Sequence, residues 1–432
     1  MLSAFGRAFR TPDLRRKLLF TIAIMSLFRV GSFVPTPGVD YGNVQQCVAV
    51  LEGETSLLGL VNTFSGGALL QLSVFALGIM PYITASIIVQ LLRVVIPRFE
   101  ALHKEGQSGQ AKLTQYTRYL TIALAILQST TIITTARTGL LFPGCNVDVV
   151  VDDRFLTAFL MVVTMTAGTG LVMWLGELIT EKGIGNGMSL LIFTSIVASF
   201  PTALWSIAGG ANGPLNFIVM IAVIILVIGM VVFVEQSQRR IPVQYAKRMV
   251  GRRMYGGTST YIPIKINMAG VIPVIFAASI LAIPALLAQF GDQTAGWVVW
   301  ISNNLAQQDQ PLYIALYVLM IVFFAFFYTS ITFNPDEVAD NMKKYGGFIP
   351  GIRAGRPTAE YLDFVITRIT SAGALYLAIV ALIPTLVLVL LGVTTNIPFG
   401  GTSILIIVGV GLEFVKQVNS QLQQRHYEGF LR

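Results

Sequence analysis

Long apolar runs recur along this 432-residue chain and constrain its fold more than any other feature. Ten of them reach about 18 residues, roughly the length that an α-helix needs to cross a bilayer. They are Leu18–Pro35, Ser73–Leu92, Tyr119–Ala136, Phe155–Leu175, Met188–Ala208, Leu215–Val234, Met268–Ala288, Pro311–Phe333, Val365–Leu391 and Ser403–Asn419. Charged residues make up 12% of the chain, against roughly 25% in ordinary globular proteins. The sequence therefore predicts an all-α, polytopic membrane protein with ten transmembrane helices, forming a single domain over residues 1–432.

The positions of the charged residues predict the orientation of these spans. The net charge is +8, and Arg29 lies inside the first run. If the N-terminus is cytoplasmic, every other Lys and Arg except Arg137 and Arg154 falls in an inward loop. Because Lys and Arg concentrate in cytoplasmic loops, we expect both termini in the cytoplasm. The basic charge then reflects topology, and no direct recognition of nucleic acid is expected beyond contact of the cytoplasmic loops with ribosomal RNA.

The second apolar run is interrupted in a way that predicts a conduit. Gly66 and Gly67 separate it from a short apolar run, Ser56–Phe64, and Pro81 interrupts the longer run. Gly- and Pro-interrupted backbone at membrane depth is tolerated only where it lines a cavity or packs inside protein. We therefore expect the stretch Phe64–Leu92 to line a passage.

An internal repeat relates the second run to the seventh. GIMPYITASI starts at Gly78 and GVIPVIFAASI starts at Gly270. Both fit the pattern G-x-x-P-x-I-x-A, which aligns Ile83 with Ile275. Chance agreement is the alternative explanation, because Gly, Pro, Ile and Ala are common in membrane helices.

The repeat predicts two inverted five-helix halves around a central pore. Each motif lies in the second span of its half, and the halves cover about 1–208 and 209–432. Because each half holds an odd number of spans, the second half enters the membrane with the opposite polarity.

Three expected cytoplasmic segments are longer than simple connectors. They are Arg93–Arg118, about 235–267 and about 334–364, and basic residues in them alternate with apolar and aromatic ones. Most connections between helices are far shorter. They are either ordinary positive-inside loops or, as we favour, docking surfaces for a cytoplasmic partner.

No arrangement of residues typical of an enzyme is found. His103 and His426 lie far apart without metal-ligand spacing, and the phosphate-binding pattern G-x-x-x-x-G-K-[ST] does not occur. The acids nearest the spans, Glu177, Glu235 and Glu413, lie towards inward ends or lack an evident partner, which argues against ion coupling. We expect no enzymatic activity, no metal and no cofactor.

Few polar side chains lie within or at the ends of the spans. Thr84, Gln128 and Asn267 either form hydrogen bonds between helices, worth about 1 kcal/mol or less each, or line a seam at which helices part. For Arg29 we favour a structural role. Cys47 and Cys145 both fall in outward loops, where they either pair in an oxidising compartment or remain free thiols.

The chain resembles the SecY family of protein-conducting channels over essentially its whole length. The motifs that carry the resemblance are specific in combination: PTPGVD, FSGG with FALGIMPYITASII, KEG followed by QYTRYLT, EKGIGNGMSLLIF, RRIPVQYAKR with GRR, NMAGVIPVIFA, GGFIPGIR and GGTSILI. The resemblance implies a passive channel with an hourglass pore, a plug and a lateral gate. Such a channel passes unfolded secretory polypeptides across the membrane and releases membrane segments sideways into lipid.

The resemblance also implies roles for particular residues. The ring that closes the pore falls on Ile79, Ile83, Ile192, Ile275 and Ile406. The plug falls on about 57–70 and includes Leu57, Leu60, Phe64, Gly66 and Gly67. The lateral gate, between the second and third spans and the seventh and eighth, has the candidates Thr84, Gln128, Asn267 and Ile283. Partner docking falls on Arg240, Arg252, Arg253 and, above all, Arg353.

The same resemblance implies a place in the cell and a set of partners. The chain would be the central subunit of the Sec translocon in the bacterial plasma membrane, with SecE and SecG as small membrane subunits. The SecA ATPase or the translating ribosome would drive it, and signal peptides and nascent chains would pass through it. A small-molecule transporter is the alternative function and predicts a polar midplane site. A purely structural membrane scaffold is a third hypothesis.

Overall fold

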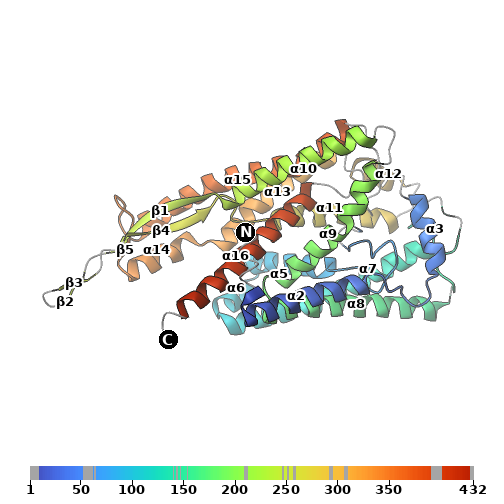
Figure 1. Ribbon diagram of the computed structural model, residues 1–432, viewed down its shortest axis with the longest axis horizontal. Helices are drawn as coiled ribbons and strands as arrows, with labels where there is room; N and C mark the ends of the chain where they lie inside the picture. The colour runs from blue at the N-terminus through green and yellow to red at the C-terminus, as the bar shows by residue number, and fades with distance from the viewer. Residues whose placement is uncertain are drawn as a thin grey trace.

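Long helices run along the longest axis of the molecule, and a small β-sheet extends from one end (Figure 1). The structure is a computed structural model. It describes residues 9–51, 62, 65–139, 141–142, 145, 147–152, 154–208, 213–245, 248–250, 253–255, 259–290, 295–305, 310–390 and 401–428.

Each of the ten predicted apolar runs overlaps a helix. These helices are α2 (Pro12–Gly31), α5 (Met80–Val95), α7 (Gln107–Arg137), α8 (Phe155–Lys182), α9 (Gly187–Ala208), α10 (Gly213–Gln236), α11 (Ile272–Phe290), α13 (Pro311–Thr332), α15 (Arg356–Leu390) and α16 (Gly401–Glu428). Among the described residues, six helices are long and apolar enough to cross a membrane unaided, and a bent pair that includes α5 makes a seventh. The predicted helical membrane fold is confirmed.

The second apolar run differs from the helix expected over its length. Residues 65–79 form successive turns, and α5 begins only at Met80. Most residues of these turns are buried, so the irregular backbone packs inside the protein, as its Gly and Pro residues predict. After Val95 the chain bends by 100° into α6 (Pro97–Lys104).

The long segments predicted as loops contain regular structure. The basic segment Arg93–Arg118 folds into α6 and the first turns of α7, which bury Leu102 against Leu113. The segment 334–364 contains α14 (Pro335–Lys344), which is capped by the Asn334 side chain. The sequence analysis did not predict these helices, which short apolar contacts stabilise within strongly charged sequences.

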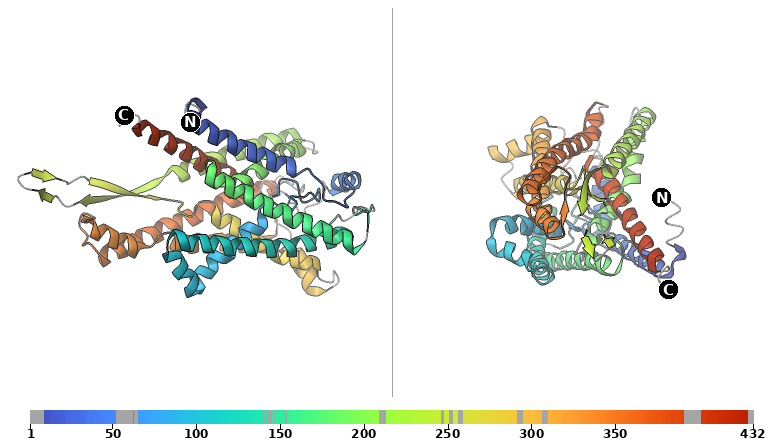
Figure 2. Two further views of the ribbon diagram at one scale, coloured as in Figure 1. Left: turned by 90° about the horizontal axis from the view of Figure 1, so that it is seen from below. Right: turned by 90° about the vertical axis from the view of Figure 1, so that its left-hand side faces the viewer.

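The third long segment, about 235–267, forms an antiparallel hairpin. Its strands β1 (Gln238–Tyr245) and β4 (Ser259–Lys265) pair with each other, and β5 (Gly347–Phe348) adds to the other edge of β1, which gives the order β4-β1-β5. Between β1 and β4, strand β2 (Arg248–Val250) pairs with β3 (Arg253–Tyr255). The hairpin reaches beyond the helices (Figure 2). We call this end of the molecule the hairpin end.

Alternating burial explains why this segment forms strands. In β1, Ile241 and Val243 are buried while their neighbours are exposed. They pack with Ile264 of β4 and with Leu362 and Val365 of α15. A period of two residues is typical of a half-buried strand, so the alternation noted in the sequence was also a signal for strands, although only a docking surface was inferred from it.

A disulfide closes the opposite end, where α3 (Tyr41–Leu51) and α12 (Gly296–Asn304) lie (Figure 1). It joins Cys47 of α3 to Cys145 with a Cα–Cα distance of 5.4 Å, which resolves the question that the sequence left open. The backbone N–H of Asp40, just before α3, donates to Val149 O at 3.0 Å. We call this end the disulfide end.

Candidate functional site

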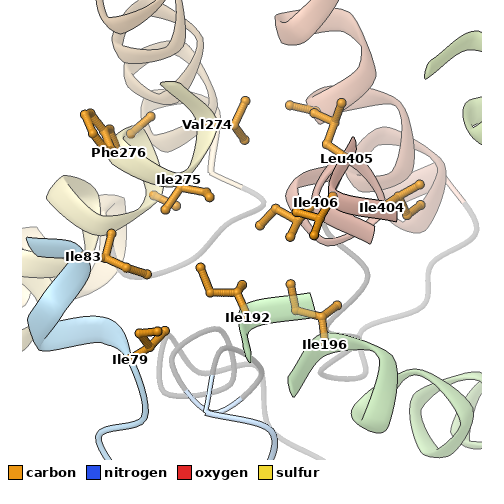
Figure 3. Close-up of a cluster of buried hydrophobic side chains, with 14 of the residues drawn as sticks. Ile79, Ile83, Ile192, Ile196, Val274, Ile275, Phe276, Ile404, Leu405 and Ile406 are labelled. Carbon is orange, nitrogen blue, oxygen red and sulfur yellow. The ribbon is translucent and has the colours of Figure 1, made fainter. Parts of the chain in front are cut away.

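Five isoleucines from four helices meet inside the bundle (Figure 3). They are Ile79 and Ile83 at the start of α5, Ile192 in α9, Ile275 in α11 and Ile406 in α16. Each is at most 8% exposed, and all five belong to one buried apolar cluster. We call these five residues the isoleucine collar. The structure thus brings together every residue for which the resemblance implies a place in the pore ring.

The collar has a definite physical character. β-branched side chains have restricted rotamers, and a narrow apolar constriction loses its water and blocks ions. Its isoleucine side chains offer no hydrogen-bond donor or acceptor. The collar can therefore seal a passage without recognising the sequence of what passes.

The sequence reasoning missed two neighbours of the collar. Ile196 lies one helical turn after Ile192 in α9, and Ile404 lies two residues before Ile406 in α16. Both are at most 1% exposed and belong to the same cluster. The sequence could have identified Ile196, because residues four apart share a helix face. It could not have identified Ile404, because residues two apart in a helix do not.

The two helices aligned by the internal repeat begin in the same way. Gly78 has φ +54° and Gly270 has φ +60°, a left-handed conformation that favours Gly. Each precedes its helix by two residues, and the helices then carry Pro81 and Pro273 in their first turn. The repeat therefore corresponds to one local structure built twice, once before Ile83 and once before Ile275.

Of the Gly pair of the predicted plug, Gly66 lies against α9. Gly66 and Gly67 have φ +70° and +88°, and the Arg29 guanidinium donates to Gly66 O. A Cβ at Gly66 would lie 3.2 Å from the Cα of Ser195 in α9. Arg29 therefore has a partner consistent with the expected structural role. That partner is a backbone carbonyl that lies outside any helix. The plug residues Leu57, Leu60 and Phe64 lie outside the described residues.

The candidate gate residues do not form one polar seam. The Thr84 hydroxyl donates to Met80 O of its own helix at 3.0 Å, and Gln128 is half-buried in α7. Asn267 donates instead to Glu235 of α10, at 2.6 Å. The backbone of Ile283 lies in α11, and its side chain is outside the described residues. The helices of the seam do meet, since α5 contacts both α7 and α11 and α11 contacts α13.

The docking candidates lie at the hairpin end. Arg240 of β1 is exposed, with its guanidinium 4.8 Å from the Tyr261 ring centroid, and Arg353 is exposed in the turn before α15. β1 pairs with β5, and Arg353 follows β5 by five residues, so both residues lie at the hairpin end. Arg253 lies in β3 with its side chain undescribed, and Arg252 lies outside the described residues.

The acids near the spans have partners that sequence reasoning did not find. Glu177 of α8 accepts two hydrogen bonds from Arg118 of α7, both at 2.8 Å, and Glu235 accepts from Asn267. The expectation that these acids lack partners was wrong because Arg118 and Asn267 lie far away in the sequence. Within the described part of the chain, no group of three or more His, Cys, Asp or Glu residues could hold a metal ion.

Known proteins similar to this chain show its family and support its fold. The SecY family model matches residues 73–415. "Protein translocase subunit SecY" of Streptomyces galbus is 67% identical, with 100% of both chains covered. The protein of the same name from Mycobacterium bovis is 58% identical, again with 100% of both chains covered.

Solved structures share the fold at lower sequence identity. A structure described as that of a protein-conducting channel aligns with a TM-score of 0.63 and 19% identity, covering 94% of this chain and 91% of that one. The channel in a canine ribosome–channel complex from the endoplasmic reticulum aligns with a TM-score of 0.62, 19% identity and the same coverage. At this identity the likeness concerns the fold alone.

Proposed function

We propose a mechanism for this chain from the premise that it belongs to the SecY family, as its match to the family model and its identity to translocase subunits establish. It is therefore a subunit of protein translocase and forms a channel that conducts polypeptides through a membrane. The roles of individual residues, the orientation and the partners are our proposals.

The isoleucine collar is the seal of the channel. The observation that carries this role is the burial of five isoleucines from four helices in one cluster. Because the collar consists of side chains on separate helices, small movements of those helices widen it without breaking a hydrogen bond within it. A polypeptide of nearly any sequence can then pass, which suits a channel for many secretory proteins.

The hairpin end faces the cytoplasm of a bacterial plasma membrane and receives the partner that drives transport. Its exposed Arg240 and Arg353, together with the positive-inside distribution of Lys and Arg, support this orientation. The SecA ATPase or a translating ribosome docks there and supplies the energy, and SecE and SecG accompany the chain in the membrane. The disulfide end then faces an oxidising compartment, where a disulfide persists.

The seam between α5 and α11 is the lateral gate. The two helices contact each other directly, and each carries a collar residue, so opening the seam also loosens the collar. A Leu or Ile that reaches the lipid gains roughly 0.3–0.6 kcal/mol, whereas a charge at the centre of the bilayer costs about 3 kcal/mol. The gate therefore sorts segments by exposing them to both lipid and the aqueous pore, so that apolar segments enter the lipid and charged segments stay in the pore.

Site-specific crosslinking tests the role of the collar. A photoreactive amino acid at Ile83 should form an adduct with a secretory chain stalled during export. Ile225 of α10 is the matched control, because it is an isoleucine that is 64% exposed on the outside of the bundle. An adduct at Ile83 and none at Ile225 supports the proposal. A small-molecule transporter gives no adduct at Ile83, and that result overturns it.

A further inference from the structure

A buried polar contact joins the base of the hairpin to the start of α11. The Asn267 side chain is 4% exposed, and its amide nitrogen donates to Glu235 Oε1 at 2.6 Å and to Gly270 O at 3.0 Å. Both N–H groups of the amide are thereby used. Gly270 is the left-handed residue from which α11 begins, so Asn267 holds both the end of α10 and the turn into α11.

The backbone closes the hairpin at the same place. Ile266 N–H donates to Ser237 O at 3.2 Å, which continues the ladder of β1 and β4 to the ends of the helices. Any tilt of the hairpin is therefore carried to Asn267 and Glu235. Ile275 of the collar lies eight residues after Asn267 and only three after the start of α11.

Two further helices converge on this contact. Lys416 of α16 donates to Glu235 O at 3.2 Å, and α16 also carries Ile406 of the collar. On α15, Gly373 allows a close approach, since a Cβ there would lie 2.7 Å from Ile266 O. The contact therefore lies at a junction of four helices, two of which carry collar residues.

An unused donor lies beside the junction. The Tyr376 hydroxyl of α15 is buried and has no hydrogen-bond partner in the described part of the chain. Tyr376 lies one helical turn after Gly373, on the face of α15 that approaches Ile266 and Asn267, and α15 contacts α10, which carries Glu235. A buried hydroxyl without a partner is costly, and the Glu235 carboxylate is an acceptor able to satisfy it.

We propose that Glu235 exchanges its donor, from Asn267 at rest to Tyr376 when a partner moves the hairpin, and that this exchange releases α11 and loosens the collar. Glu235, Asn267 and Tyr376 are positioning residues, because none of them lines the collar. This inference rests on the proposed function of the collar. It adds a route by which docking at the hairpin end reaches Ile275 of the seal, in the first turn of α11.

Three variants of the full chain, co-produced with the other translocon subunits and reconstituted in vesicles, test the exchange. Asn267→Asp sets a second carboxylate against Glu235, in surroundings that hold Lys265 and Lys416 as well as Glu413. We expect a resting ion conductance about tenfold higher, the change typical of losing a charge-assisted hydrogen bond. In the double variant Glu235→Gln with Asn267→Asp the amide and the carboxylate change places, and the conductance should return towards that of the unmodified chain.

Tyr376→Phe is the decisive variant, because it removes only a hydroxyl that has no partner at rest. The exchange predicts an unchanged or lower resting conductance and export several-fold slower, by about the loss of one neutral hydrogen bond in the open state. A purely structural role predicts export at the normal rate.

Normal export by Tyr376→Phe, or failure of the double variant to restore the seal, overturns the inference. The proposed function is judged separately by the collar itself. If Ile83→Gly with Ile275→Gly leaks while the variants of the junction behave normally, the collar stands and the exchange alone is wrong. If the collar variant does not leak, the proposed role of the collar as the seal is overturned, and the exchange has no seal to act on.

Discussion

The two helices that carry Ile83 and Ile275 begin alike but are reached from opposite ends of the molecule. Both follow a left-handed glycine and carry a proline in the first turn. The chain approaches α5 from the disulfide end, through the buried turns of residues 65–79. It approaches α11 from the hairpin end, through exposed strands.

The difference between the two approaches is one of constraint. At the disulfide end the approach to α5 is fixed by Arg29 on Gly66 O, by buried turns and by a nearby disulfide. At the hairpin end, the hairpin is joined to α11 through the hydrogen bonds of Asn267 to Glu235 and Gly270 O and of Ile266 to Ser237 O, without a disulfide among the described residues there. We therefore expect a partner that pulls on the hairpin to move α11 more easily than α5, so that α5 is the fixed side of the collar and α11 the movable side.

The largest expected effect follows from reversing a charge at the hairpin end. Arg353→Glu should abolish motor-driven export, because Arg353 is exposed at the hairpin end, while insertion of the channel into the membrane stays normal. Export into vesicles is the measurement. Arg356→Glu is the matched control, since Arg356 is also exposed but pairs with Glu360. Equal losses in the two variants would mean that only the total charge of this end matters.

The next effect concerns the collar, where the two approaches meet. Ile83→Gly with Ile275→Gly should raise the resting ion conductance of reconstituted vesicles by about tenfold or more, because an apolar constriction blocks ions only while it stays narrow and dry. If α5 is fixed and α11 movable, the single variants Ile83→Gly and Ile275→Gly should both raise the resting conductance. Only the conductance of Ile275→Gly should also change when a partner docks. An unchanged conductance of the double variant would contradict the assignment of the seal.

A smaller effect is expected from the disulfide, which constrains only one of the two approaches. Cys47 and Cys145 are 98 residues apart, and closing a loop of this length stabilises a protein by up to about 4.7 kcal/mol in the chain-entropy model. Cys47→Ala with Cys145→Ala should lower the thermal unfolding temperature and leave the resting conductance at ambient temperature unchanged.

Reductant supplies the control for this prediction. It should lower the unfolding temperature of the unmodified chain towards that of the double variant, and it should leave the unfolding temperature of the double variant unchanged. If reductant and mutation both leave the unfolding temperature unchanged, the disulfide does not hold this end. The approach to α5 would then be fixed by its buried turns alone.

The sequence predicted those parts of the fold that depend on periodicity and composition. The ten apolar runs became helices, and the Gly–Pro repeat became two equivalent helix starts, because both signals act over a few neighbouring residues. The collar residues were predicted from the resemblance to the SecY family, and the structure places them in one buried cluster. Residue spacing alone could not have selected five isoleucines among so many.

Features that depend on pairs far apart in the sequence were missed. The contacts of Arg118 with Glu177 and of Asn267 with Glu235 join residues 59 and 32 positions apart, and nothing in either local sequence identifies the partner. The disulfide remained one of two alternatives for the same reason. The hairpin was missed although its alternation was visible, because length and charge favoured a loop.

The smallest effect distinguishes backbone strain from packing at the approach to α5. Gly66 and Gly67 both have positive φ, at +70° and +88°, so alanine at either position should cost about 1–2 kcal/mol of stability from the left-handed conformation. A Cβ at Gly67 meets nothing within 4 Å, whereas one at Gly66 lies 3.1 Å from Arg29 Nη1 and 3.2 Å from Ser195 Cα. Gly66→Ala should therefore lower the unfolding temperature more than Gly67→Ala, by the equivalent of about 1 kcal/mol or more for overpacking. Equal effects would mean that the backbone beside α9 yields readily, and the approach to α5 would then be no more fixed than the approach to α11.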